Sequence, residues 1–533
     1  MRTDSVADRA HTHDDMSRRA LLWIAAACGV LGAIVTLAVA EVVAYFVAAA
    51  SSPLFAVGSW IVDLAPAGFK EWIIHTFGTS DKPVLFVSLG ILLLALALLV
   101  GLLEYLRPPL GSVALAVIGT VAALAVVTRP GASVVWIAPT VVGVVVGVIM
   151  LRGSIDRMRR WRRAETTDRR VPSSEPLLAR RSFLRYVGVG AGIALVVGIG
   201  ARAINAGSAA VTAVRNAVKL PKPAIAAPPV PAGASLNVQG LSPFVTPADQ
   251  FYRIDTALQV PALNSDDWKL HIGGMVDHEV DITFAELLAL PLTEHMLTLA
   301  CVSNEVGGDL VGNAMWLGYP IRELLKKAGP QQGADMVLSR SSDGFTAGTP
   351  LDVLTDDNTD ALLAVGMNGA PLPLEHGFPV RMVVPGLYGY VSATKWVVEL
   401  TVTRFSKAIG YWTDKGWSER GPVKTASRID TPKDGASIKT GTRAIAGVAW
   451  DQHTGISKVE VRVNNGDWQT ARLADSVSAD TWRQWVVEWN APKGSHTIEV
   501  RATNADGHTQ TSTQAPPAPN GATGWHTIHV SAA

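Results

Sequence analysis

The chain has 533 residues, of which 48% are hydrophobic and 17% are charged, and its formal net charge is +1. A chain of this length is expected to form several domains, and its composition is too apolar for an ordinary soluble protein. The near-zero net charge gives no sign of a nucleic-acid partner. Its two cysteines are too few for a four-cysteine zinc site, an iron–sulfur cluster or a c-type haem attachment.

The N-terminal part, residues 1–201, contains five apolar runs. The first four are close to or above the roughly 20 residues that a helix needs to cross a bilayer, and the last is shorter and rich in glycine. The sequence therefore predicts a five-helix transmembrane anchor, with buried helices of a soluble domain as the alternative. The runs are Leu21–Ala50, Pro83–Leu106, Leu110–Val127, Ser133–Leu151 and Tyr186–Ala201.

Basic residues predict the orientation of this anchor. An Arg-rich loop is expected over residues 152–181, and Arg18 and Arg19 precede the first run. Since basic segments stay in the cytoplasm, five crossings would place everything after the anchor on the extracytoplasmic side of the cell membrane. Arg180-Arg181, followed by Ser-Phe-Leu, is typical of a twin-arginine export signal, although two arginines can also simply anchor a helix end.

A linker rich in Pro and Ala is expected over residues 202–234, as an extended spacer. Residues 235–424 mix short strands and short helices, which favours an α+β domain. The predicted strands are Trp268–Ile272, Val280–Thr283, Leu297–Val302, Met336–Arg340, Arg381–Val384 and Trp396–Val402. The predicted helices are Phe284–Leu290, with Thr283 as its N-cap, Pro320–Ala328 and Thr359–Val365.

Cys301 lies where an apolar strand opens into a loop with Asn304, Gly307 and Gly308. Such loops turn sharply and expose backbone groups, so this thiol is well placed to face a pocket. Alternatively, a free cysteine is simply a small buried hydrophobe.

A second dense stretch runs from Glu375 to Trp396. His376, Arg381 and Lys395 supply polar or cationic donors, and the glycines between them let backbone amides approach a ligand closely. This inventory suits a phosphate-like anion, although each residue alone could be a surface charge or a turn residue.

The string HGFPVRMVVPG, the later KW pair, Cys301 and the earlier Phe251-Tyr252-Arg253 together resemble the sulfite oxidase superfamily of molybdopterin-dependent oxidoreductases. The resemblance covers about residues 240–405. It implies a mononuclear molybdenum bound to one molybdopterin, oxygen-atom transfer as the chemistry, and Cys301 as catalytic residue and metal ligand. The cofactor contacts it implies are Asp249, Tyr252, Arg253, Ser341, His376, Arg381, Ser392 and Lys395.

The chain departs from the sulfite-oxidising relatives where these carry basic residues. After their cysteine comes x-Gly-Asn-Arg-Arg, whereas this chain has Val302-Ser303-Asn304-Glu305-Val306. Their Arg-Asn-His element is replaced by Ile254-Asp255-Thr256, and their active-site tyrosine falls near Phe345. The donors for sulfite are therefore missing, and the substrate stays open among S-oxides, N-oxides and oxyanions.

Residues 425–533 alternate apolar and polar residues in short runs separated by turns, which predicts an immunoglobulin-like β-sandwich. In the resembling family a domain at this position often forms dimers, so a homodimer is expected. Four tryptophans are candidates for its core or an interface, with the core favoured: Trp468, Trp482, Trp485 and Trp489.

The leading hypothesis is thus a membrane-anchored, extracytoplasmic molybdenum oxidoreductase. Its partners would be a small-molecule substrate, membrane lipid and a separate electron-transfer protein or quinone, and no nucleic acid. One alternative is a cysteine hydrolase in which His295 or His376 activates Cys301. Another is a non-catalytic envelope protein that keeps the pterin fold and binds a partner through its sandwich.

Overall fold

The structure is a computed structural model that describes residues 18–48, 51–64, 81–129, 132–167, 175–204, 207–257 and 260–533. The chain divides into two compact units, Met1–Ala206 and Gly207–Ala533.

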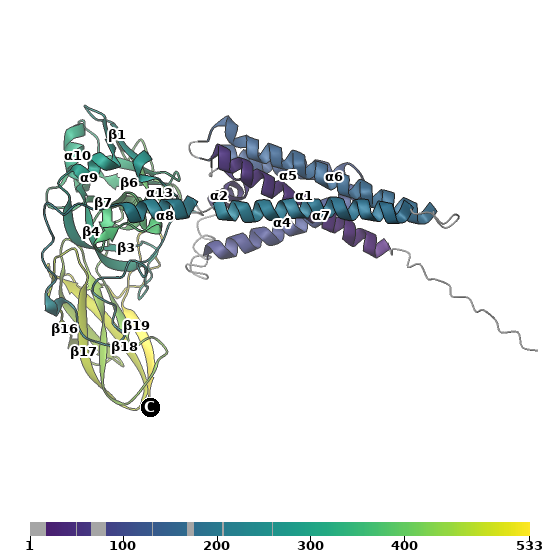
Figure 1. Ribbon diagram of the computed structural model, residues 1–533. Helices are drawn as coiled ribbons and strands as arrows, with labels where there is room; N and C mark the ends of the chain where they lie inside the picture. Colours follow the sequence, from purple (N-terminus) through teal and green to yellow (C-terminus); the bar gives the residue numbers. More distant parts are fainter. Residues whose placement is uncertain are drawn as a thin grey trace, which may run out of the picture. The chain divides into compact units, whose positions relative to one another are not determined.

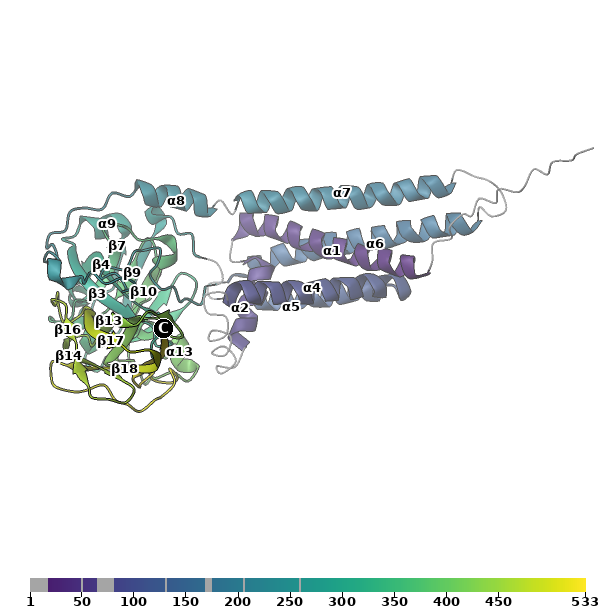
Figure 2. The same ribbon diagram turned by 90° about the horizontal axis from the view of Figure 1, so that it is seen from below.

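The first unit is helical, and its long helices run side by side (Figures 1 and 2). Its helices are α1 (Arg18–Val47), α2 (Pro53–Leu64), α4 (Asp81–Leu106), α5 (Leu110–Val127), α6 (Ala138–Thr167) and α7 (Glu175–Ile204). Small residues let them approach closely, as membrane helices often do. At the crossing of α1 and α4, a Cβ on Gly29 would lie 2.0 Å from the Ala97 carbonyl oxygen.

Among the residues that the structure describes, four helices are long and apolar enough to cross a membrane: Arg18–Val47, Val84–Leu106, Leu110–Val127 and Val134–Ala164. They match the first four predicted crossings. The predicted fifth, Tyr186–Ala201, lies within α7, where several side chains are outside the described residues. Four of the five crossings are therefore supported.

The prediction of an Arg-rich loop over residues 152–181 is wrong for most of its length. Residues up to Thr167 continue α6, and α7 begins at Glu175, while residues 168–174 are outside the described part. Arg, Met and Ala are good helix formers, and the neighbouring helix provides partners for the arginines. The Arg157 guanidinium lies 3.7 Å from the ring centroid of Tyr186.

The second unit begins with α8 (Gly207–Ala217) and an extended segment. The sequence predicts an extended spacer over residues 202–234; in the structure, parts of this stretch are hydrogen-bonded to the domain that follows. Arg215 of α8 donates to the carbonyl oxygens of Leu372 and Pro371 at 2.7 and 2.6 Å. The Ile225 carbonyl accepts from the Glu294 amide at 2.9 Å. The extended segment thereby covers part of an otherwise open sheet edge.

The α+β domain contains two sheets. One has the strand order β2-β1-β10-β5-β6, and the other β3-β4-β7-β8, with β9 paired to β7. The strands are β1 (Lys269–Gly274), β2 (Val280–Thr283), β3 (Thr293–Ala300), β4 (Val311–Pro320), β5 (Met336–Ser341), β6 (Thr346–Pro350), β7 (Leu362–Met367), β8 (Ala370–Pro371), β9 (Arg381–Val383) and β10 (Val397–Thr403). Short helices connect them: α9 (Phe284–Ala289), α10 (Ile321–Ala328), α11 (Leu351–Thr355), α12 (Gly389–Ser392) and α13 (Tyr411–Asp414).

The six predicted strands and two of the three predicted helices are confirmed. Thr283 caps α9 in a reciprocal capping box with Glu286, as its position predicts. The predicted helix Thr359–Val365 is wrong, because most of it belongs to the strand β7. All residues of β7 are buried, and a short run that is apolar on both faces does not distinguish helix from strand.

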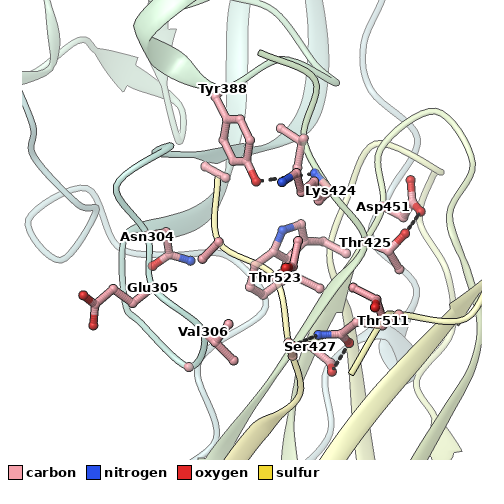
Figure 3. Close-up of a pocket in the computed structure, with 18 of the residues that line it drawn as sticks. Asn304, Glu305, Val306, Tyr388, Lys424, Thr425, Ser427, Asp451, Thr511 and Thr523 are labelled. Atoms are coloured by element: carbon pink, nitrogen blue, oxygen red, sulfur yellow. Dashed lines mark hydrogen bonds between the residues drawn. The ribbon is translucent and has the colours of Figure 1, made fainter. Parts of the chain in front are cut away.

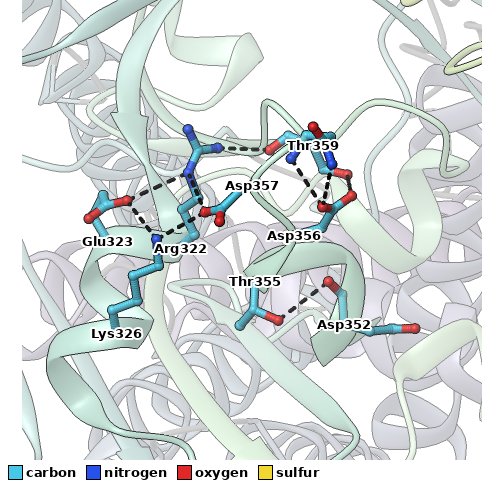
Figure 4. A network of polar contacts seen from close by, with 9 residues as sticks. Arg322, Glu323, Lys326, Asp352, Thr355, Asp356, Asp357 and Thr359 are labelled. Atoms are coloured by element: carbon cyan, nitrogen blue, oxygen red, sulfur yellow. Dashed lines mark hydrogen bonds and ion pairs between the residues drawn. The ribbon is translucent and has the colours of Figure 1, made fainter.

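A network of surface charges attaches α10 to the loop before β7 (Figure 4). The Lys326 ammonium lies 3.0 Å from an Asp357 oxygen and 3.3 Å from a Glu323 oxygen. Arg322 donates to the Thr359 carbonyl at 3.1 Å. Because these charges are near solvent, the network positions the loop more than it stabilises the fold.

The C-terminal part is a β-sandwich, as predicted. Its sheets have the orders β11-β13-β17-β16 and β12-β19-β18-β14-β15. The strands are β11 (Ala426–Thr431), β12 (Ser437–Ile438), β13 (Gly441–Trp450), β14 (Ile456–Val463), β15 (Gln469–Thr470), β16 (Arg472–Leu473), β17 (Arg483–Ala491), β18 (Gly494–Asn504) and β19 (His526–Ala532). Trp482, Trp485 and Trp489 are buried, whereas Trp468 is half-buried. Trp482 and Trp450 belong to the hydrophobic core of the α+β domain, so the two domains share a core.

Candidate active site

Cys301 follows the last residue of β3 and is buried, with 7% of its surface exposed. Its amide donates to the Leu310 carbonyl at 2.9 Å, and the Leu310 amide donates to the Asn304 side-chain oxygen at 2.9 Å. The loop is therefore closed at its base. Burial raises the pKa of the Cys301 thiol, while hydrogen bonds from Ser303 oppose this rise. A metal bound here would have to displace the proton, as metals do when they coordinate thiols.

Arg381 is the most unusual charge in the unit. It begins β9, is 5% exposed, and lies 5.1 Å from the ring centroid of Trp316. Among the described residues, its guanidinium donates only to the carbonyl oxygens of His376 and Met382, both at 3.3 Å. Within the described residues no carboxylate pairs with it, and burial lowers its pKa to about 10. A buried cation without a counter-charge is costly, so this position suits a bound anion.

Lys395 is buried too, but its charge is already balanced. Its ammonium donates to Asp255 at 2.7 Å and to the Glu375 carbonyl at 3.0 Å. The same Asp255 oxygen accepts from Arg253 at 3.0 Å. Burial lowers the Lys395 pKa to about 8, and Asp255 opposes that shift. Asp255 was identified from the sequence only as a departure from the relatives, and the structure shows it joining two of the predicted cofactor contacts.

His376 and Tyr252 complete this cluster. Nε2 of His376 lies 2.9 Å from the Ala248 carbonyl oxygen, so Nε2 carries a proton and Nδ1 does not. Burial, with help from Arg381, lowers the His376 pKa to about 4, which keeps the ring neutral. Burial raises the pKa of Tyr252, and the nearby Cys301 raises it further while Arg381 lowers it. Tyr252 is thus close enough for both the Cys301 thiol and the buried Arg381 guanidinium to affect its pKa.

Three predicted site residues are arranged differently. The Ser392 hydroxyl donates to the Tyr388 carbonyl at 3.0 Å, within the turn of α12. The Ser341 hydroxyl accepts from the Asp343 amide at 3.4 Å. Asp249 is exposed. The structure therefore brings Tyr252, Arg253, His376, Arg381 and Lys395 into one connected cluster, and these three lie outside its hydrogen bonds.

The β-sandwich contacts both sides of Cys301, and nothing in the sequence patterns predicted this. Before Cys301, Thr298 of β3 donates its amide to the Asp480 carbonyl at 3.0 Å and accepts from the Trp482 amide at 2.8 Å. After Cys301, Arg428 donates to the Gly308 carbonyl at 2.9 Å. Gly307 has φ +81, and a Cβ there would lie 2.3 Å from the His526 ring.

A cavity of about 340 Å³ lies between the Cys301 loop and the sandwich (Figure 3). Ala300, the residue before Cys301, lines it together with the loop residues 304–307 and Tyr388. The sandwich contributes a wall rich in hydroxyl and amide groups, and Lys424 leads into that wall.

Comparisons with known proteins match both domains of the second unit. Residues 257–412 match the oxidoreductase molybdopterin binding domain, and residues 426–500 match a bacterial Ig domain. Human mitochondrial sulfite oxidase is 27% identical over 305 residues, which cover 48% of this chain and 55% of that protein. The uncharacterized oxidoreductase YuiH of Bacillus subtilis is 34% identical over 154 residues, covering 29% of this chain and 74% of that protein.

Among solved structures, the sulfane dehydrogenase SoxCD from Paracoccus pantotrophus aligns with a TM-score of 0.45 and 23% identity. The alignment covers 50% of this chain and 75% of that one. The chain spans about half the length of the mammalian sulfite oxidases that it matches.

Proposed function

Because the chain belongs to the sulfite oxidase superfamily of molybdopterin-dependent oxidoreductases, we propose that it is a membrane-anchored enzyme whose molybdenum is bound by Cys301. The family implies a molybdenum–molybdopterin cofactor. When bound, this cofactor supplies two-electron oxygen-atom transfer. The observation that carries the assignment of the site is Arg381, a buried guanidinium without a carboxylate partner in the described part of the chain. Arg381 and Cys301 both affect the pKa of Tyr252, which therefore links the guanidinium to the thiol.

In this proposal each side chain of the cluster has a separate task. Arg381 neutralises the cofactor's anionic group. His376 stays neutral and presents its unprotonated Nδ1, because Nε2 donates to the Ala248 carbonyl. Lys395 supplies a further donor from its fixed position on Asp255. Tyr252 keeps its proton, since its pKa is raised, and can donate a hydrogen bond beside the thiolate.

The remaining predicted contacts have weaker support. Arg253 is held by Asp255 and is partly exposed, so it suits the outer edge of the cofactor site. Ser341 and Ser392 are buried and Asp249 is exposed. The Ser392 hydroxyl already donates to the Tyr388 carbonyl, whereas the Ser341 hydroxyl accepts from the Asp343 amide and keeps its own hydrogen for a ligand.

The side of the membrane on which each part of the chain lies is also part of the proposal. Pairs such as Trp161 with Phe183 and Arg157 with Tyr186 show that α6 and α7 run antiparallel, as successive crossings would. The arginine-rich end that the two helices share would be cytoplasmic. With α7 as the fifth crossing, the oxidoreductase domain and the sandwich would lie outside, and the Arg180-Arg181 pair would serve export.

The test is metal and pterin analysis of the purified full-length protein. We expect about one molybdenum per chain, lost in Cys301→Ser, with a changed Mo(V) electron paramagnetic resonance signal in any residual fraction. Cys28→Ala is the matched control, because Cys28 is the other cysteine and lies in α1. Wild-type protein without molybdenum, or Cys301→Ser with unchanged molybdenum and spectrum, would contradict the proposal.

The cysteine hydrolase is not supported by the geometry. His295 pairs with Asp360 at 2.8 Å, and His376 is bonded to the Ala248 carbonyl. Across the described ranges, no histidine hydrogen-bonds to the Cys301 thiol. The alternative of a non-catalytic envelope protein is tested by an activity assay with a redox dye. Molybdenum-loaded protein that turns over no oxide or oxyanion in this assay would favour that alternative.

A further inference from the structure

One carboxylate oxygen joins two of the predicted cofactor contacts. The Oδ2 atom of Asp255 accepts from the Lys395 ammonium at 2.7 Å and from the Arg253 guanidinium at 3.0 Å. The Asp255 side chain is 4% exposed, so water screens these charges only weakly. Lys395 lies 140 residues further along the chain than Asp255, and therefore only folding brings the three groups together.

The two cations share this single carboxylate, so a net positive charge remains on the three groups. Within the described part of the chain, neither Arg253 nor Lys395 pairs with a second carboxylate. Lys395 also donates to the Glu375 carbonyl at 3.0 Å, and Arg253 uses its Nε hydrogen on Asp255. Because an ammonium and a guanidinium carry more hydrogens than these contacts use, both cations keep donors for a ligand.

Trp396 fixes the position of Lys395 from another side. The Lys395 ammonium lies 4.6 Å from the ring centroid of Trp396, a contact that favours the charged form of the amine. Trp396 is 1% exposed and has φ +51, a left-handed backbone conformation that is costly for a bulky residue. Its indole donates to the Leu374 carbonyl at 2.9 Å, which holds the ring in place. Such strain persists where the surrounding structure enforces it, and it is concentrated at functional sites.

Burial and charge act in opposite directions on the Lys395 ammonium. Burial, with smaller contributions from Arg381 and Arg253, lowers its pKa to about 8, whereas Asp255 opposes this shift through its charge and its hydrogen bond. Without the carboxylate, the pKa would therefore fall further and the amine would lose its charge nearer to neutral pH. His376 does not titrate in this range, because burial lowers its pKa to about 4. The charged and titratable groups around the ammonium are Arg253, Asp255, Glu375, His376 and Arg381.

We propose that Asp255 is a positioning residue, which keeps Lys395 charged and beside Arg253 so that both cations act on the anionic group of the cofactor. This inference rests on the proposed function and deepens it, because it makes cofactor retention depend on pH through one carboxylate. Asp255 acts through Lys395 and is not itself a contact for an anion. It lies in the Ile254-Asp255-Thr256 element, where the chain departs from the sulfite-oxidising relatives.

The experiment compares anion binding by the wild type and by Asp255→Asn as a function of pH. It uses the full-length protein in detergent, produced without cofactor, and inorganic sulfate as the probe. Sulfate keeps its charge between about pH 5.5 and 8.5, whereas the Lys395 ammonium titrates within this range. Affinity is measured by isothermal titration calorimetry at constant ionic strength, because screening would otherwise change with the buffer.

In the wild type, sulfate affinity should be constant at acidic pH and fall above about pH 8, where Lys395 loses its proton. A contacting opposite charge shifts a pKa by about one to three units, so the fall in Asp255→Asn should begin at least one pH unit lower. The variant should then bind sulfate about fivefold or more weakly at pH 8, with a smaller difference at acidic pH. Cofactor-loaded Asp255→Asn should likewise release its pterin faster than the wild type at this pH, measured by pterin fluorescence. A carboxylate that only stabilised the fold would change the affinity by the same factor at every pH.

Further variants test whether the effect runs through Lys395. Asp255→Glu keeps the charge and should keep the fall near pH 8, and it provides the test if Asp255→Asn does not fold. Lys395→Met should bind sulfate weakly and without this pH dependence, and the double variant Lys395→Met/Asp255→Asn should also lack it. Asp266→Asn is the matched surface control and should follow the wild type, because Asp266 is an exposed aspartate of the same domain.

The outcomes separate this inference from the proposed function. Wild-type protein that contains no molybdenum after normal expression contradicts both. Wild-type protein that does contain molybdenum, together with a sulfate affinity that falls at the same pH in Asp255→Asn as in the wild type, overturns the inference alone. So does a fall near pH 8 that persists in Lys395→Met, or one that moves to lower pH in Asp255→Glu as far as expected for Asp255→Asn.

Discussion

Replacing Arg428 with methionine tests whether the β-sandwich holds the Cys301 loop in place. The Arg428 side chain is 9% exposed and makes three bonds: to Asp430 at 2.6 Å, to the Ser242 hydroxyl at 2.9 Å and to the Gly308 carbonyl at 2.9 Å. Its removal leaves the Asp430 carboxylate, 1% exposed, without its cation. Breaking a buried ion pair from one side costs about 3 to 5 kcal/mol.

For a unit of this size, an unfolding entropy of about 2.1 cal/mol/K per residue makes 1 kcal/mol equivalent to about 1.5 °C. Arg428→Met should therefore lower the melting temperature of the second unit by about 4 to 7 °C, measured by calorimetry. The peptide covering residues 304–310 should also exchange its amide hydrogens faster, because Gly308 loses its anchor.

The double variant Arg428→Met/Asp430→Asn separates the two effects. It removes the unpaired carboxylate and should recover at least half of the lost stability, yet the loop should still exchange faster than in wild type. A loss below about 1 kcal/mol in the single variant, or an unchanged exchange rate in both, would refute the reasoning that the sandwich holds this loop.

Three further predictions follow from individual residues. Arg381→Met should lower molybdopterin retention by at least about tenfold, because a charge-assisted bond is lost. The cofactor-free variant should be as stable as the wild type or more stable in calorimetry, since the substitution removes a buried unpaired charge. A less stable cofactor-free variant would count against the role of Arg381 in binding an anion. Folding lowers the His526 pKa to about 4, from the ordinary 6.5, chiefly through burial. The folded state then binds fewer protons, so stability is complete above about pH 6.5 and falls toward pH 4; His526→Asn should flatten this fall and the exposed His529→Gln should not. Gly377 has φ +112, and a Cβ there would lie 2.9 Å from the Arg381 Cβ. Gly377→Ala should therefore lower the free energy of unfolding by about 1 to 3 kcal/mol and weaken pterin retention, measured by the fluorescence of the released pterin. Unchanged retention would contradict this prediction.

Much of the architecture could be predicted from the sequence, because it depends on local patterns. Runs of apolar residues predicted the four supported crossings, and alternation predicted the sandwich strands. Thr283 and Glu286 predicted the start of α9, since a capping box is complete within four residues. The wrong predictions arose where local patterns were not informative. The strand β7 is apolar on both faces, so its sequence has no period that distinguishes strand from helix. The arginines after Leu151 suggested a loop, because their partners, such as Tyr186, lie on another helix.

The candidate site was only partly predictable. A resemblance in short motifs identified Cys301 and, in one later stretch of the chain, His376, Arg381 and Lys395. The sequence could not show that Asp255 neutralises Lys395 while Arg381 has no carboxylate partner among the described residues, although this difference determines which cation is available to an anion.

The sequence by itself determined the order of the parts, the apolar helices of the first part, and the thiol and cations available for chemistry. Only the tertiary structure decided that the sandwich contacts the chain on both sides of Cys301, through Arg428 and Trp482. The physical reason is that segment type depends on interactions within a few residues, whereas the charge balance of a buried site depends on groups more than a hundred residues apart that only folding brings together.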